Sequence, residues 1–230
     1  MIPRMVCIVA CALALPACSA LTPSQQTAAP QPKAASPITA QNQASLYLNV
    51  VDGLLKQERF GAALAFLDGY AGRQMDTPPR YWLMRATALA GLGRNDEAAQ
   101  AYAKLAATPL AAEGWNGQGR VAANRKQWRS ASGFFRKAVE ASPANAEFIN
   151  NLAYSGMQLG EFGASIAYLR QAHELDPAST LIRNNLIIAL TLSGDTAGAN
   201  ALMLAIADPG RRQDVETMVR RAIQVRKDNG

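Results

Sequence analysis

The sequence predicts an all-α solenoid of about five helix–turn–helix repeats with a C-terminal capping helix, preceded by a signal peptide and a disordered tether. Three observations lead to this prediction. Apolar residue types make up 49% of the 230 residues, but aromatic ones only 7%, which is typical of packed helices rather than a β-sandwich. Similar residues recur every 33 or 34 positions over residues 45–208. Glycines and prolines lie at the positions where the helices of the repeat are expected to end.

Residues 1–17 have the order of a secretory signal peptide. Arg4 precedes an apolar stretch, Met5 to Leu15, which is shorter than the roughly 20 helical residues that span a bilayer. The next residues, Leu15-Pro16-Ala17-Cys18, resemble the lipobox of bacterial lipoproteins, in which the cysteine is lipidated and becomes the first mature residue. We therefore expect a membrane anchor at Cys18, since each buried methylene of an acyl chain contributes about 0.8 kcal/mol.

Two other readings of this segment remain open, because proline at Pro16 is unusual just before the small residue. Ile8-Val9-Ala10-Cys11 fits the local pattern but leaves a short apolar region, and ordinary cleavage after Ala20 would leave no lipid. With lipid on Cys18, Ser19 stands where aspartate typically marks retention in the inner membrane. The expected location is therefore the periplasmic face of the outer membrane.

Residues 18–44 have the composition of a flexible tether. They are rich in Ala, Pro, Gln, Ser and Thr, contain one charged residue, Lys33, and have no aromatic residue. Such a stretch has too little apolar surface to offset the entropy of ordering. We expect it to hold the folded part away from the membrane.

The repeat pattern is clearest in the middle of the chain. Trp115-x3-Gly119-x2-Ala122 is followed by Ala131-x3-Phe135-x2-Ala138 and then Pro143. Corresponding positions in the other four copies begin at Tyr47, Trp82, Ile149 and Arg183. The pattern resembles the tetratricopeptide repeat (TPR), a 34-residue helix–turn–helix unit.

Particular residue types indicate how each unit is built. Small residues at Gly119, Ala131, Ala153, Ser165 and Ala199 let paired helices approach, whereas Tyr102, Phe135, Leu169 and Met203 fill space against the next unit. Turns between paired helices are expected at Gly93, Gly160 and Gly194.

Residues 209–230 are expected to form the capping helix, which has one apolar stripe made by Val215, Met218, Val219, Ala222 and Ile223. It contains six Lys and Arg residues and three acidic residues. The basic surface could meet anionic lipid or an acidic partner, or simply be solvated.

The residues give little support for catalysis. There is one histidine, and all three cysteines precede residue 19. No metal-ligand spacing or phosphate-binding loop is evident, and His173 is expected to be a solvated surface residue. We therefore expect no enzymatic activity, cofactor, metal or small-molecule substrate. The net charge of +6 does not indicate nucleic-acid binding in an exported protein.

A set of asparagines is the main candidate for binding. Asn116, Asn150 and Asn184 recur one repeat apart, and Asn151 and Asn185 lie beside two of them. In TPR proteins the first helix of each repeat lines an inner groove, where amide groups could hold an extended peptide. Alternatively, these asparagines could join neighbouring helices.

One helical turn beyond Asn116 and Asn150 lie Arg120 and Tyr154, which would add a charge and a stacking surface to the groove. Trp128 begins the second helix of its repeat and is expected to pack in the core.

The repeats of residues 80–208 resemble those of TadD-like TPR lipoproteins of tight-adherence (Tad, or Flp) pilus systems. The resemblance lies in the NNL motifs Asn150–Leu152 and Asn184–Leu186, the turn Ser193–Asp195 and the stretch GWNGQGRVAANRKQW. It implies a protein partner, an outer-membrane secretin subunit, that the lipoprotein helps to assemble as a pilotin. The alternative is a TPR adaptor or pilotin of another envelope system, such as a type IV pilus or a cell-wall hydrolase scaffold.

Overall fold

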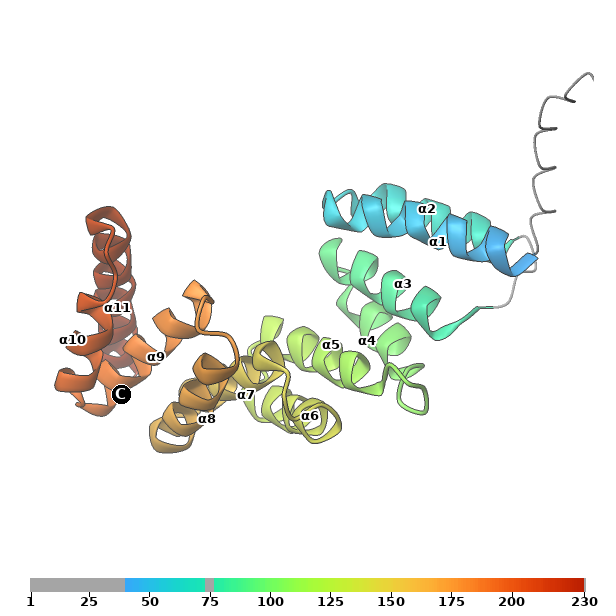
Figure 1. The fold of residues 1–230 in the computed structure, drawn as a ribbon. Coiled ribbons are helices and arrows are strands. Elements are labelled where there is room, and N and C mark those ends of the chain that lie inside the picture. The colour runs from blue at the N-terminus through green and yellow to red at the C-terminus, as the bar shows by residue number, and fades with distance from the viewer. Residues whose placement is uncertain (1–39, 73–76, 230) are drawn as a thin grey trace, which may run out of the picture. The chain divides into compact units, whose positions relative to one another are not determined.

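The computed structural model describes residues 40–72 and 77–229, which form eleven α-helices and no strand (Figure 1). The first helices of the five repeats are α1 (Ala40–Lys56), α3 (Pro79–Gly91), α5 (Ala111–Asn124), α7 (Ala146–Gln158) and α9 (Thr180–Ser193). Their second helices are α2 (Phe60–Ala71), α4 (Asn95–Ala103), α6 (Trp128–Ala141), α8 (Phe162–Leu175) and α10 (Thr196–Leu204). The last helix is α11 (Pro209–Asn229).

The signal peptide, Cys18 and most of the expected tether lie outside the described residues. Helix α1 begins at Ala40, within the stretch expected to be tether. Pro37 is the last proline before it, so no fixed-φ residue interrupts the helix from Ala40 onward.

The turn inside each repeat is the same in all five units. A residue just after the first helix takes a left-handed conformation, with φ between 55° and 93°, at Glu58, Gly93, Lys126, Gly160 and Gly194. The next amide then donates to a carbonyl five residues back, as Arg94 does to Leu89 at 2.9 Å. This bond satisfies a carbonyl that the helix end would leave free. The three predicted glycine turns are confirmed.

Small residues bring the two helices of a repeat together. A Cβ on Gly119 would lie 2.5 Å from ring carbons of Phe135 in the paired helix. Ala131, Ala153 and Ser165 are fully or almost fully buried at the related positions. The large residues Tyr102, Phe135 and Leu169 are buried as expected, but Met203 is only half-buried, because only α11 follows its repeat.

Neighbouring repeats contact each other through both helix types. Each second helix packs on the first helix of the next repeat, and successive first helices also touch, from α1–α3 to α9–α11. The first helices therefore share one side of the stack, which we call the odd-helix face. Thr87, Arg120, Tyr154 and Ile188 occupy matching positions on it, one repeat apart.

Helix α11 packs on α9 through one side. Val215 is buried, and Val219 and Ile223 are half-buried. Met218, expected in the same stripe, is 47% exposed, because it lies at the edge of the packed side. Arg226 holds the C-terminal end of α11 by donating to the Leu192 carbonyl in the last turn of α9.

The same Arg226 guanidinium lies 5.0 Å from the centre of the Phe162 ring in α8, a cation–π distance. These contacts place α11 as the terminal cap that the sequence predicted. None of the helices in residues 40–72 and 77–229 combines the length and hydropathy needed to cross a membrane.

The left-handed turn at Lys126 leads to a stability prediction. A residue other than glycine in the left-handed conformation costs roughly 1–2 kcal/mol of folding free energy. Glycine removes this cost, but its greater conformational freedom in the unfolded chain cancels part of the gain. We therefore expect Lys126→Gly to raise the free energy of unfolding by about 1 kcal/mol, measured by chemical denaturation. Gly160→Ala, at the matching turn, should lower it. A loss of stability in Lys126→Gly would contradict this account of the turn.

Candidate functional site

Amide hydrogen bonds join three successive helices of the odd-helix face. The Asn151 Nδ2 of α7 donates to the Asn116 Oδ1 of α5 at 2.9 Å, and the Asn185 Nδ2 of α9 donates to the Asn150 Oδ1 of α7 at the same distance. Asn116, Asn150 and Asn185 are 6%, 3% and 8% exposed. Four of the five asparagines therefore use their amide groups inside the protein.

The series of asparagines stops at α9. Asn184 corresponds to Asn150 one repeat later, and its Oδ1 is buried with no hydrogen-bond partner among the described residues. In both observed bonds the donor lies 35 residues after the acceptor. The residue 35 positions after Asn184 is the apolar Val219 of α11, which has no side-chain donor. This geometry supports the reading that the asparagines join neighbouring helices. Their direct contact with a peptide stays a prediction.

Arg120 and Tyr154 lie at the surface, unlike most of the asparagines. Arg120 is exposed, and within the part of the chain that the structure describes its guanidinium has no hydrogen-bond or ionic partner. Tyr154 is 40% exposed, and its ring meets the half-buried Trp128 ring edge-on, with 5.9 Å between the centroids. Together they offer a cation and an aromatic surface on neighbouring repeats.

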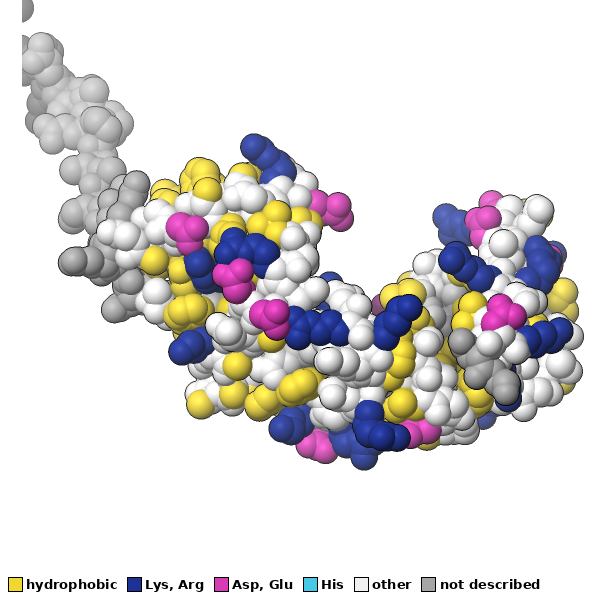
Figure 2. All heavy atoms as spheres, turned by 180° about the vertical axis from the view of Figure 1, so that it is seen from behind, with side chains coloured by type: hydrophobic (Ala, Val, Ile, Leu, Met, Phe, Trp, Pro, Cys, Tyr) yellow, Lys and Arg dark blue, Asp and Glu magenta, His cyan; other side chains and the backbone are white. Residues whose placement is uncertain are grey.

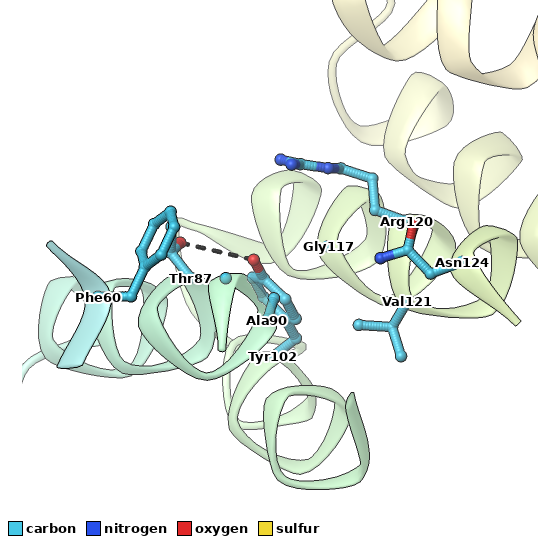
Figure 3. Close-up of a pocket in the computed structure, with 9 residues that line it drawn as sticks. Phe60, Thr87, Ala90, Tyr102, Gly117, Arg120, Val121 and Asn124 are labelled. Carbon is cyan, nitrogen blue, oxygen red and sulfur yellow. Dashed lines mark hydrogen bonds between the residues drawn. The ribbon is translucent and has the colours of Figure 1, made fainter. Parts of the chain in front are cut away.

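A small cavity lies beside Arg120 (Figure 3). It measures about 120 Å³, and its lining residues come from α2, α3, α4 and α5. Two glycines create room for its aromatic walls, because a Cβ on Gly117 would overlap the Tyr102 ring and one on Gly91 would lie 2.5 Å from the Phe60 ring. The cavity is thus built into the packing of the first three repeats.

Hydroxyl groups give this cavity a polar wall. The Tyr102 hydroxyl is 3.5 Å from Thr87 Oγ1, and Thr87 Oγ1 already donates to the Leu83 carbonyl at 2.9 Å. Because Thr87 Oγ1 uses its proton on Leu83, the Tyr102 hydroxyl is the donor in the 3.5 Å contact, which is long for an O–H···O hydrogen bond. Asn124, one turn after Arg120, is also exposed at the cavity.

Several acidic side chains are already paired with other arginines. Asp96 accepts from Arg125 at 2.7 Å, and Asp68 pairs with Arg85. The hydrogen bonds from Arg94 hold the pKa of Glu97 below its usual range. Figure 2 shows dark-blue Lys and Arg side chains lying next to yellow hydrophobic ones on one face of the molecule. Arg120 is in no ion pair among the described residues, and the apolar Ala90 and Val121 line the cavity beside it.

Among the residues around the cavity, the sequence singled out Arg120 as a groove residue and Tyr102 as a packing residue, but it did not indicate the cavity itself. One signal for its aromatic wall was present in the sequence. The first residue of three second helices is aromatic, namely Phe60, Trp128 and Phe162. Trp128, expected in the core, is only half-buried. His173 also differs from the expectation, because it is half-buried and its Nδ1 is enclosed. In the described ranges, no three His, Cys, Asp or Glu residues lie close enough to hold a metal ion.

Family comparisons agree with this architecture. Two models described as tetratricopeptide repeat match the chain, one at residues 48–109 and 83–146 and the other at residues 146–179. Together they cover more than half of the sequence. The chain belongs to the tetratricopeptide-repeat proteins, whose fold is a scaffold for protein–protein interaction.

Solved structures of TPR proteins share the fold. TTC0263, a thermophilic TPR protein of Thermus thermophilus, has 21% identity and a TM-score of 0.62, over 79% of this chain and 99% of that one. MamA from residue 41 to its end, from Desulfovibrio magneticus RS-1, has 22% identity and a TM-score of 0.60, over 78% and 98%. At such identities the similarity concerns the fold. Comparison with curated proteins gives no match.

The paired asparagines predict strong energetic coupling. Asn185→Leu leaves the buried Asn150 carbonyl without a donor, and Asn150→Leu leaves the Asn185 amide without an acceptor. Each should cost about 1–3 kcal/mol of unfolding free energy. The double variant should cost less than the sum, because no polar group is then orphaned. Denaturation of the four proteins measures the coupling.

Asn200→Leu is the control for this cycle, since Asn200 is an exposed asparagine of α10 and should change stability by no more than about 0.5 kcal/mol. Additive effects of Asn150→Leu and Asn185→Leu would show that the bond does not join the two repeats.

Proposed function

We propose that this protein is a TPR lipoprotein of the bacterial envelope that assists Tad pilus assembly as a pilotin for the outer-membrane secretin. The resemblance of the NNL motifs Asn150–Leu152 and Asn184–Leu186 to TadD-like repeats is the observation that carries the proposal. The TPR fold supports it, because the fold supplies a protein-binding scaffold. The lipobox-like residues ending at Cys18 supply the membrane anchor.

The odd-helix face is the binding surface in this proposal. Its available groups are the Arg120 guanidinium, which has no partner among the described residues, the exposed Tyr154 ring and the cavity lined by α2 to α5. The hydrogen-bonded asparagines set the positions of these groups, and their own contact with a peptide stays a prediction. A secretin segment would lie across successive first helices, as extended peptides lie in other grooves.

The two attachments act together. Lipid at Cys18 would restrict the protein to the membrane surface, and the face would hold the secretin subunit there. Linking two binding events raises the effective concentration of the second. Binding would also stabilise, by mass action, the state of the secretin subunit that the protein recognises. The mechanism therefore needs no covalent chemistry.

Secretin multimers in membrane fractions test this function. In a strain that carries the Tad genes, deletion of this gene and Cys18→Ala should each remove the multimer from the outer membrane or misplace it, because both break the attachment. Cys11→Ala is the matched control, since it removes another cysteine of the same leader, and it should leave the multimer unchanged.

Other outcomes are equally informative. A normal multimer in the deletion strain would contradict the pilotin function and favour an adaptor for another envelope system. Loss in the deletion strain but not in Cys18→Ala would retain the secretin partner and remove the lipid from the mechanism. Equal loss in Cys11→Ala and Cys18→Ala would show that the leader itself is damaged, which contradicts a specific effect of lipid on Cys18, and loss in Cys11→Ala alone would assign the lipid to Cys11.

A further inference from the structure

The cavity beside Arg120 has the size of one side chain. Its volume is about 120 Å³, close to the roughly 150 Å³ of an engineered apolar cavity that holds a benzene ring. Phe60, Ala90 and Val121 supply apolar walls. Val121 is buried, and Phe60 and Ala90 are half-buried, so an inserted apolar side chain would leave water on the sides that these residues cover.

The polar groups at this cavity favour a negatively charged neighbour. Arg120 and Asn124 both line it from α5, whereas Thr87 and Ala90 line it from α3 (Figure 3). Arg120 has no ionic partner in the described part of the chain, and no acidic side chain lines the cavity. A guanidinium without an internal partner offers several N–H donors to an incoming carboxylate.

We propose that this cavity and Arg120 form a subsite for an extended partner segment in which an apolar side chain enters the cavity and a carboxylate within two residues of it binds Arg120. The subsite rests on the proposed function only in taking the odd-helix face as the binding surface, and it does not depend on the partner being a secretin. The required chemistry is an apolar residue followed or preceded closely by Asp or Glu.

The spacing of the helices limits where these groups stand in the partner. Packed helices lie about 8–10 Å apart, and an extended chain advances about 3.3 Å per residue. One helix step therefore corresponds to about three partner residues. The apolar side chain and the carboxylate share the α3–α5 step, and the Tyr154–Trp128 ring pair receives the residue about three positions further on.

Synthetic peptides test the subsite directly. The full chain, purified in detergent, is titrated into three labelled twelve-residue peptides of Gly and Ser, and binding is followed by fluorescence anisotropy. The first peptide carries one Leu and, two residues later, one Asp; the second has Asn for the Asp; the third has Ser for the Leu. The first should bind about tenfold more tightly than either of the others, because each lacks one of the two contacts.

Two variants separate the two contacts. Arg120→Gln should abolish the preference for Asp over Asn while keeping the preference for Leu. Thr87→Leu fills the cavity, so it should abolish the preference for Leu over Ser while keeping the preference for Asp over Asn. Ala90→Leu serves the same purpose if Thr87→Leu unfolds. Arg221→Gln is the control, because Arg221 is likewise exposed without an ionic partner in the described chain but lies on α11.

Equal binding of the three peptides, or binding of none, overturns the subsite, as does an unchanged Asp preference in Arg120→Gln. These results are distinguishable from failure of the pilotin function. Secretin loss on gene deletion without peptide discrimination would overturn the subsite alone. Peptide discrimination with a normal secretin multimer would overturn the secretin partner alone.

Discussion

The hydrogen bond between the buried amides of Asn150 and Asn185 sets the geometry on which the odd-helix face depends. Apolar surfaces can slide by part of a turn at modest cost, whereas a buried amide without its partner costs about 1–3 kcal/mol. The bond therefore favours one alignment of α7 and α9, and the Asn116–Asn151 bond does the same for α5 and α7. The fixed alignment places Arg120 and Tyr154 in one row.

The N-terminal repeats are joined by a different kind of contact. At the positions of Asn116 and Gly117, α3 carries Leu83 and Met84. Aromatic rings join the first two repeats instead. Tyr70 of α2 is fully buried and stacks on Tyr81 of α3, with 5.5 Å between the ring centroids. The cavity lies where these two regions meet, so its walls combine rings from the first region with glycine and arginine from the second.

The sequence was sufficient for the helices and the turns that glycine marks, because the repeat brings small and large side chains into the same places in each unit. It did not indicate the left-handed Glu58 and Lys126, since a conformation imposed by the flanking helices needs no special residue. Arg120 and Tyr154 are exposed, and their place in a binding groove stays a prediction. The choice between the two roles of the asparagines required the rotation of each helix against its neighbour, which residue spacing alone does not specify.

The alternation of donor and acceptor has a consequence for how such a chain can grow. The repeat of α7 and α8 gives one amide donor, Asn151, to the repeat before it and one side-chain carbonyl, Asn150, to the repeat after it. A duplicate of residues 146–179 inserted between α8 and α9 would thus find its donor and its acceptor already matched at both new junctions. Duplication of this unit would lengthen the face by one helix step, or about three residues of an extended partner, without any new compensating substitution.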